Sequence, residues 1–422
     1  MKNKMKFQIH YGWFVLTIGT LAIIGAIGFS RFSFSTVLPY MQADLGIDNG
    51  QAGFLATMSF LGYLTLALIG GALASKYGSR LIATFGLTVA GLGMVFTGLS
   101  SGYSWVAVFC LMAGLGSGAV HLSIFGLWPA WFTKSKRGLA SGIAISGGPL
   151  GMILAGCIVP VFAFAYGQSA WRASWILFGS FTLLAALLTF LFIRNYPAEK
   201  NLKPVGFTGE TDQPPNNYRK SSDWKYVYTL PLVWILGIIY FAFGFTYIIY
   251  MTFFVKHLVA DIGVTAVLAA RLFMILGWIS LISGIIWGWL SDVVGRRITL
   301  VSLLALQAAA SVLFSVGETP LLYISSTFLY GFSVCVPAIM AVVCGDFLGP
   351  ELASAGLGFV TLFFGLGQVL GPVVGGFMAD AFGSFAPVFI MTAAIALVGA
   401  VISLLFVKNF DQVNKPGKLE QQ

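Results

Sequence analysis

The sequence has 422 residues, of which 58% are hydrophobic and only 9% are charged, and its formal net charge is +9. Roughly a quarter of the residues in a soluble domain are charged, so these values exclude a soluble globular protein, a disordered chain and a secreted disulfide scaffold. A helical membrane crossing takes about 20 apolar residues. Twelve crossings would use about 240 residues, which leaves enough chain for loops and tails. The composition therefore predicts an all-α membrane protein.

Twelve long apolar runs, broken by Gly, Pro and charged residues, predict the transmembrane helices. In the first half they lie near Gly12–Tyr40, Gly53–Ala74, Leu81–Leu99, Ser104–Trp131, Gly138–Tyr166 and Trp171–Ile193. In the second half they lie near Leu230–Val255, Val264–Leu290, Ile298–Val316, Pro320–Leu348, Ser354–Phe377 and Ala386–Val407. These runs are too long for the roughly ten-residue strands of a membrane barrel.

The basic residues predict how the spans are oriented. Of the 23 Lys and Arg residues, 19 fall on one side of the twelve-span arrangement, which identifies that side as cytoplasmic. Both termini then lie in the cytoplasm of a multi-pass protein of the plasma (inner) membrane. The basic start runs into a first span too long for a cleavable signal peptide. The positive charge indicates contact with anionic lipid, and we expect no nucleic-acid partner.

Residues that would carry other chemistry are missing from the sequence. Four cysteines lie inside apolar runs without a CxxC spacing, so we interpret them as packing residues and expect no metal site and no cofactor. There is no GxxxxGK[ST] phosphate loop, HExxH or GxSxG motif, so neither an ATP-driven pump nor an intramembrane enzyme is predicted. The cysteines are Cys110, Cys157, Cys335 and Cys344.

A polar stretch divides the chain into two similar halves. Residues 194–225 carry four prolines and ten charges and are predicted to form a cytoplasmic linker between residues 1–193 and 226–422. At a shift of 217 residues, the segment 71–80 falls on 288–297 in the same loop of each half. At a shift of 216 to 217, Gly28-Phe-Ser and Asp44-Leu-Gly fall on Gly244-Phe-Thr and Asp261-Ile-Gly. The halves are therefore predicted to be a parallel duplication of six-helix units.

The two matching loops resemble the loop motif of the major facilitator superfamily, as does Trp171-Arg172 at the head of the sixth span. The second loop carries the full pattern, whereas the first has Ser75 in the acidic place. The resemblance implies two pseudo-symmetric six-helix bundles around a cavity that opens alternately to each side. It also implies that these loops form a cytoplasmic latch, with the residues Gly71, Arg80, Gly288, Asp292, Gly295, Arg296 and Arg297.

A narrower resemblance is to the monocarboxylate and oxalate/formate porters. It rests on residues 131–151, on Tyr11-Gly-Trp13 at the first span and on an arginine in the eighth span, Arg271. Proton-coupled monocarboxylate porters generally pair that arginine with an aspartate one turn earlier, where this chain has Val267. The resemblance thus implies a carrier of organic anions and leaves open whether a proton or a counter-anion accompanies them.

Arg31 and Arg271 are the two basic residues inside the predicted spans, one in each half. An arginine there costs about 2.5 to 3.5 kcal/mol on insertion scales, so it usually faces a cavity. Arg31 lies roughly 14 Å and Arg271 roughly 10 Å from the outer ends of their spans at 1.5 Å per residue. A guanidinium matches a carboxylate in bidentate fashion, so both are predicted to bind an anion. The alternative is that one of them reaches the interface or caps a helix break.

Further candidates for substrate binding are polar side chains in the middle of spans. Tyr240, Tyr247 and Tyr250 lie on one face of the seventh span, together with Phe243; packing between helices is the alternative. His121 in the fourth span could bind substrate or carry a proton, or could bond a neighbouring helix. Gln368 lies in the eleventh span among glycines that favour close helix packing.

These observations predict a secondary active transporter of small organic anions, monocarboxylates or short dicarboxylates, that works by alternating access. It would run as an anion exchanger or a proton-linked symporter, and as a monomer in the lipid bilayer. One alternative is a multidrug exporter of the same superfamily, although the spans lack the acidic residue on which such exporters usually rely. The remote alternative is a membrane sensor that does not transport.

Overall fold

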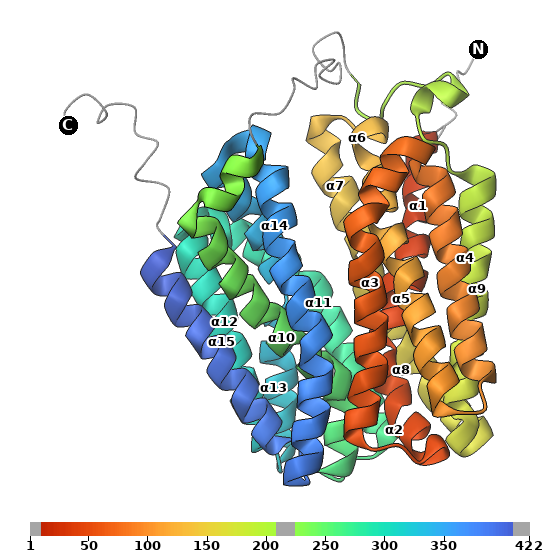
Figure 1. Cartoon of the computed structure of the whole chain (residues 1–422), viewed down its shortest axis with the longest axis vertical. Coiled ribbons are helices and arrows are strands. Elements are labelled where there is room, and N and C mark those ends of the chain that lie inside the picture. Colours follow the sequence, from red (N-terminus) through yellow and green to blue (C-terminus); the bar gives the residue numbers. More distant parts are fainter. Residues whose placement is uncertain (1–9, 208–223, 408–422) are drawn as a thin grey trace, which may run out of the picture. The chain divides into compact units, whose positions relative to one another are not determined.

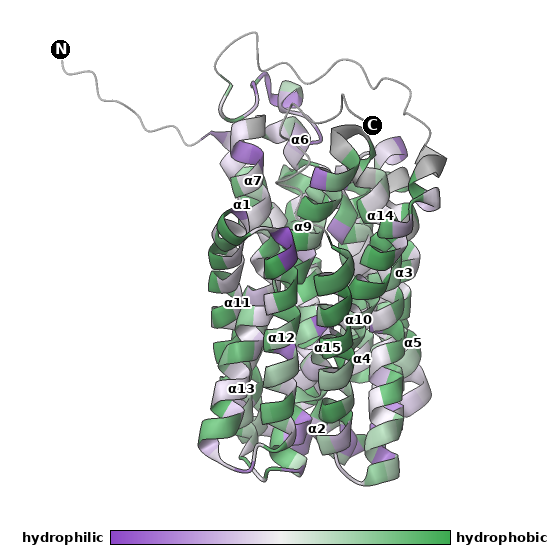
Figure 2. Ribbon diagram, turned by 90° about the vertical axis from the view of Figure 1, so that its left-hand side faces the viewer, coloured by the Kyte–Doolittle hydropathy of each residue, from purple (hydrophilic) through white to green (hydrophobic). Residues whose placement is uncertain are grey.

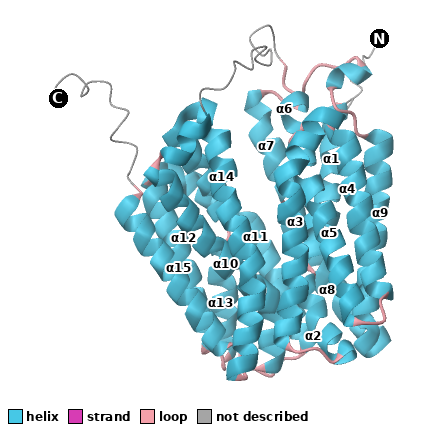
Figure 3. Cartoon of the chain, viewed as in Figure 1, coloured by secondary structure: helices cyan, strands magenta, loops and turns pink. Residues whose placement is uncertain are grey.

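The computed structural model describes residues 10–207 and 224–407. Helices make up nearly all of these residues, and no strand forms among them (Figure 3). An isolated β-bridge joins Phe132 to Val205. Half of the predicted linker (208–223) and the basic residues of both tails lie outside the described ranges.

The first half of the chain folds into helices that match its six predicted spans, with several breaks inside them. The first span has three parts, because a π-helical segment and a turn at Ser33 interrupt it. The elements are α1 (Tyr11–Ile23), η1 (Ile24–Phe32), α2 (Phe34–Leu45), α3 (Asn49–Tyr77), α4 (Ser79–Leu99), α5 (Tyr103–Phe125), α6 (Trp128–Trp131), α7 (Lys134–Ile145), α8 (Gly147–Tyr166), η2 (Gly167–Ser169), α9 (Ala170–Phe192) and η3 (Pro197–Lys200).

The second half repeats this arrangement. Its helices begin and end within a few residues of the predicted spans, and the last part of the tenth span is continuous with the eleventh. The elements are η5 (Trp224–Thr229), α10 (Pro231–Ala260), α11 (Ala266–Val294), α12 (Arg296–Ser315), α13 (Pro320–Ser333), α14 (Val336–Phe382) and α15 (Ala386–Phe406).

Ten stretches of the described chain are long and apolar enough to cross a membrane. One of them, Ser135–Phe192, has 58 residues, which is enough for two crossings at 1.5 Å per residue. With α3, which has 29 residues, the helices accommodate the twelve predicted crossings. Figure 2 shows hydrophobic residues along the helices and hydrophilic residues gathered at their ends. Leu397, Val401 and Leu405 of α15 are exposed, as expected for side chains that face lipid tails.

The chain forms two compact units whose borders differ from those of the predicted halves. The first unit contains the described residues up to Ser33, together with Leu61–Gly151 and the residues from Arg172 to 207. The second contains Phe34–Phe60, Met152–Trp171 and the described residues from 224 onward. The borders differ because α2, the start of α3 and most of α8 pack with the helices of the second half. In that unit α10 packs on α14, and α12 runs beside α15 (Figure 1).

The backbone repeats at the shift predicted from the sequence. Gly78 precedes α4 with φ 89° and ψ 140°, and Gly295 precedes α12 with φ 86° and ψ 157°. Gly46 and Gly263, which follow the first spans of the two halves, also have positive φ (64° and 79°). Residues with a Cβ rarely adopt such angles, so glycine is favoured at both members of each pair. The agreement at a shift of 217 residues supports a duplicated six-helix unit.

Each unit has its own apolar core. In the first unit Val15, Val120, Ile124 and Trp128 pack together between α1, α5 and α6. In the second, Phe243, Leu300, Leu303 and Met340 pack between α10, α12 and α14. These cores hold in place the helices that carry the polar residues of the candidate site.

Candidate functional site

Arg31 lies at the end of the π-helical segment η1 of the first span. The Ser33 N–H donates to the Gly28 carbonyl at 3.1 Å, a bond five residues back that is typical of a π-helix. A Cβ built at Gly28 would lie 2.7 Å from the Cα of Gly151 and 2.9 Å from the oxygen of Gly147. Only glycine permits this close approach of η1 to the residues around Gly147 and Gly151. The side chain of Arg31 lies in the interior and is 8% exposed.

Two aromatic residues from other helices join Arg31 in a cluster. The guanidinium carbon lies 4.1 Å from the centre of the Tyr63 ring, in α3. The Tyr63 hydroxyl is 2.6 Å from Nδ1 of His121, in α5. The positive charge of Arg31 lies close enough to interact electrostatically with both Tyr63 and His121. Three helices therefore bring Arg31, Tyr63 and His121 together; we call these residues the Arg31 cluster.

The Arg31 cluster is partly open. Tyr63 and His121 are half-buried, and within the described residues Nε2 of His121 has no hydrogen-bond partner. Phe125 covers one side of His121, with ring centres 5.0 Å apart. A polar group entering beside Tyr63 would meet a cation, a hydroxyl and an imidazole.

The first half of the chain has few carboxylates, and none of them is close along the sequence to Arg31, Tyr63 or His121. Between residues 10 and 193 the acidic residues are Asp44 and Asp48, at the end of α2 and just after it. Oδ2 of Asp44 accepts a hydrogen bond from Nε1 of Trp171 at 3.0 Å. Closer to Arg31, Ser117 donates to Ser30 at 3.0 Å, and both serines are buried. The helices around Arg31 thus supply a positive charge and neutral polar groups.

The sequence singled out Arg31 and His121 but missed Tyr63. The chain has 15 tyrosines, and the position of Tyr63 in an apolar run does not distinguish it from a packing residue. Its position beside His121 depends on the approach of α3 to α5, where Gly62 allows tight packing: a Cβ there would meet the Leu111 oxygen at 2.3 Å.

The tyrosines of the seventh span lie in the second unit and differ in their surroundings. Tyr240 is buried and stacks on Phe364, with ring centres 4.5 Å apart. Tyr250 is fully buried, stacks on Tyr330 at 3.5 Å and shares a hydrogen bond of 2.6 Å with Ser326. These contacts match the packing alternative for Tyr240 and Tyr250.

Tyr247 is half-buried on the same helix. Its backbone oxygen accepts a hydrogen bond from the Tyr330 hydroxyl at 3.1 Å. Of the three predicted tyrosines it is therefore the most accessible, and it stays a candidate for substrate binding.

Two further candidates also belong to the second unit. Arg271 is exposed on α11, on the same face as Trp278, Ile282 and Trp289, which are exposed as well. Gln368 is buried in α14, 1% exposed. The joint role of Arg31 and Arg271 in binding an anion stays a prediction.

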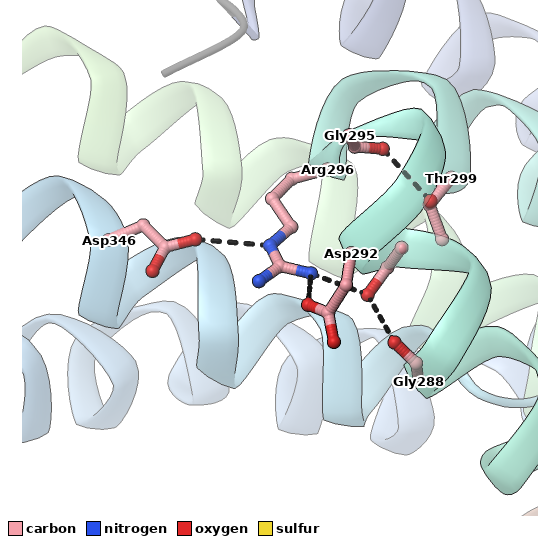
Figure 4. Close-up of polar contacts among 7 residues, drawn as sticks. Gly288, Asp292, Gly295, Arg296, Thr299 and Asp346 are labelled. Carbon is pink, nitrogen blue, oxygen red and sulfur yellow. Dashed lines mark hydrogen bonds and ion pairs between the residues drawn. The ribbon is translucent and has the colours of Figure 1, made fainter. Parts of the chain in front are cut away.

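The predicted latch loop of the second half holds a network of charges (Figure 4). Nη1 of Arg296 donates to Oδ1 of Asp292 at 2.6 Å, and its Nε donates to Oδ2 of Asp346 at 3.1 Å. Nη1 also reaches the Ser291 hydroxyl at 2.6 Å. The network joins the start of α12 to the end of α11 and to α14.

Each latch loop also carries an arginine at the equivalent position, Arg80 in the first half and Arg297 in the second. Nε and Nη2 of Arg80 donate to the Phe190 carbonyl, at 2.9 and 2.6 Å, near the end of α9. Arg297 donates to the Leu404 carbonyl near the end of α15. Each arginine therefore ties the third span of its half (α4 or α12) to the free carbonyls at the end of the sixth span (α9 or α15). A cation is favoured at such a helix end.

The chain is similar to membrane transporters along nearly its whole length. It is 25% identical to a hexuronate transporter of Bacillus subtilis (strain 168), covering 95% of this chain and 96% of that protein. It is 22% identical to the probable sulfoacetate transporter SauU of Cupriavidus necator (95% of each chain) and to monocarboxylate transporter 12-B of Danio rerio (95% and 86%).

A solved structure shows the same fold. A bacterial homologue of the human lysosomal transporter Spinster, in an inward-facing and occupied conformation, matches with a TM-score of 0.74 at 18% identity, over 95% of this chain and 98% of that one. The match confirms the predicted all-α major facilitator fold.

The sequence also matches a family model that is described as "Uncharacterised MFS-type transporter YbfB", over residues 23–404. The family consists of transporters, as predicted, rather than enzymes. The chain is a multi-pass membrane protein that belongs to this family of the major facilitator superfamily.

Proposed function

We propose that the chain is a secondary active transporter of small organic anions that works by alternating access in the cytoplasmic membrane. The observation that carries the proposal is the Arg31 cluster, in which a buried guanidinium is held against Tyr63 beside a half-buried histidine. In a water-poor site a fixed guanidinium binds a carboxylate or sulfonate strongly and with defined geometry.

The relatives support an anionic cargo. The printed names of three of them refer to hexuronate, sulfoacetate and monocarboxylates, all of which carry a carboxylate or a sulfonate at neutral pH. A site built around Arg31 can accept that shared group, while other residues select the carbon skeleton. We propose that Arg271 and Tyr247 contribute to this selection.

The membrane orientation and the latch belong to the same proposal. The bias of basic residues favours cytoplasmic termini. The loops that contain Arg80 and Arg296 would then lie on the cytoplasmic side, where the ion pairs of Arg296 with Asp292 and Asp346 hold the start of α12 to the end of α11 and to α14. We propose that these contacts change as the transporter alternates between its two states.

The proposal predicts that purified protein binds organic anions and not their neutral analogues. We would test D-glucuronate, D-galactonate, sulfoacetate and L-lactate by thermal shift and by counterflow in liposomes, with D-glucose as the uncharged control for glucuronate. Arg31→Lys is expected to weaken binding of the preferred anion about 10- to 100-fold, because Lys cannot form the bidentate fork.

Arg172→Lys serves as the matched control, since Arg172 donates to the Ser100 carbonyl, away from the Arg31 cluster. The control is expected to bind like the wild type. Wild-type affinity in Arg31→Ala, or binding of cationic dyes in place of all four acids, would contradict the proposed function.

A further inference from the structure

The hydrogen bond between Tyr63 and His121 can run in either direction. A neutral histidine with a bare Nδ1 accepts the Tyr63 proton, whereas a protonated histidine carries hydrogen on both nitrogens and must donate to the Tyr63 oxygen. At 2.6 Å the two atoms are in firm contact, so the direction of this bond determines where the hydroxyl proton of Tyr63 points.

The direction of this bond matters because of where Tyr63 lies. One end of the residue contacts His121 and its ring lies against the guanidinium of Arg31, at 4.1 Å. When the hydroxyl proton is given to His121, it is not available to a bound anion. When His121 donates instead, the hydroxyl can donate to an anion that Arg31 holds.

We infer that Tyr63 is a binding residue of the anion site and that its hydrogen bond with His121 reverses when His121 takes up a proton, so that anion and proton bind together. The inference rests on the proposed function. One proton passes from water to the imidazole, both ring nitrogens then carry hydrogen, and the freed hydroxyl proton of Tyr63 donates to the anion.

Charge makes the two binding events cooperative. A second positive charge beside Arg31 is unfavourable in a site of low dielectric constant. An anion between Arg31 and Tyr63 offsets it, so the bound anion favours the protonated histidine, and by linkage the proton favours the anion to the same degree. The site then needs no carboxylate inside the spans to couple anion movement to proton movement.

Among the described residues of the helices packed around His121, Arg31 is the charged group that contacts the Arg31 cluster. The elements packed against α5 are η1, α1 and α4, and α3 joins them through Gly62 and Gly118. Their remaining titratable or cationic side chains lie at helix ends, where Tyr11 and Arg80 bond backbone carbonyls. These remaining groups are Tyr11, Lys76, Tyr77 and Arg80.

The test measures affinity for D-glucuronate, D-galactonate, sulfoacetate and L-lactate between pH 8.5 and 5.5, where all four acids stay ionised. Wild-type protein is expected to bind its preferred acid more tightly as the pH falls, by up to tenfold per unit, because one proton binds with it. Adding that acid at pH 7 in weak buffer should also remove protons from solution, which a pH indicator records without any variant.

Three substitutions separate the parts of the mechanism. Tyr63→Phe keeps the ring against Arg31 but removes the hydroxyl, so binding should weaken about 10-fold and lose its pH dependence. His121→Asn should also flatten the pH profile. Tyr63→Leu removes the ring as well and should approach Arg31→Lys in affinity.

His10→Asn is the matched control. His10 Nδ1 accepts the Gly12 N–H at 3.0 Å at the start of α1, and Asn caps a helix equally well, so this variant should keep the pH profile of the wild type. If Tyr63→Phe and His121→Asn kept both affinity and pH profile while Arg31→Lys bound weakly, the proposed function would stand and this inference would fall.

Absence of proton uptake by wild-type protein on binding would overturn the inference in the same way. If the wild type bound none of the four acids, the proposed function itself would fail, and the inference with it.

Discussion

At the scale of single residues, the informative positions are those where burial and charge coincide. Arg31 could be identified from the sequence because an arginine inside an apolar run stands out. Tyr63 could not, because its importance depends on a contact between two spans that are far apart along the chain. His257 was also missed: it is buried, with Nε2 2.8 Å from the Phe314 carbonyl and Nδ1 2.9 Å from Oδ2 of Asp261.

Asp261, in the turn after α10, gathers several hydrogen bonds on one oxygen. Its Oδ2 accepts from the Phe385 N–H at 2.6 Å and from the Ser384 hydroxyl at 2.9 Å, in addition to the contact with His257. Burial alone would raise the pKa of Asp261. The hydrogen bonds and the charge of His257 outweigh it and lower the pKa below its ordinary value.

We therefore predict a pH-dependent loss of stability in Asp261→Asn. A carboxylate with a lowered pKa stabilises the folded chain fully above its ordinary pKa, near 3.8, and this contribution is lost as the pH falls through the lowered value. The variant should melt a few degrees below the wild type from pH 5 to 8, and the difference should shrink below about pH 4. Glu318→Gln, at an exposed position, should melt like the wild type at every pH. A constant gap down to pH 3 would contradict the assignment.

At the scale of elements, the sequence predicted the spans well because apolar runs of about 20 residues have few alternatives in a membrane. It gave a helix break near Arg31 only as an alternative, and it missed the turn between α5 and α6, the turn at Ser146 and the break between α13 and α14. Such breaks depend on backbone contacts with neighbouring helices, which hydropathy does not record. Glycine-rich stretches were a sign of them, since Gly25 and Gly28 both lie in η1.

Replacing Gly28 tests how the π-segment is held. In Gly28→Ala the new Cβ would clash with the backbone of Gly151 and Gly147, and overpacking of this kind costs about 1 to 3 kcal/mol. We expect a lower melting temperature and weaker anion binding, because the segment that carries Arg31 must shift. Gly142→Ala in α7, where a Cβ meets nothing within 4 Å, is the control and should leave both unchanged. Equal behaviour of the two variants would show that η1 tolerates the shift.

At the scale of the whole molecule, the sequence predicted the duplication and the superfamily from loop motifs. The borders of the compact units could not be predicted in this way, because they depend on which helix ends pack together. In the second unit, the start of α3 contacts α14: the carboxylate of Asp380 accepts the N–H groups of Asn49 and Gly50, at 3.1 and 2.6 Å. Thr57 donates to the Val369 carbonyl at 2.8 Å.

Alternating access, as proposed, requires this contact between the two halves of the chain to break and re-form. Asp380→Asn should weaken it, since an ionised carboxylate binds the N–H groups at a helix start better than an amide does. The measurement introduces a cysteine by Thr57→Cys in a Cys157→Ser background. We expect this cysteine to react several-fold faster with a membrane-impermeant maleimide when Asp380→Asn is also present. Asp48→Asn, which removes a neighbouring carboxylate that accepts only the local Gln51 N–H, should not change the rate. An unchanged rate in Asp380→Asn would rule out this role.

The continuity of α3 has a mechanical consequence. The helix runs unbroken from Asn49 to Tyr77 and crosses from one compact unit into the other between Phe60 and Leu61. The same helix carries Gly50, which Asp380 binds, and Tyr63, which is bound to His121. The two residues are about 20 Å apart along the helix at 1.5 Å per residue. A change at the Asp380 end of α3 would therefore be transmitted along the helix to Tyr63, so that α3 would couple the contact proposed to open to the group proposed to sense the proton.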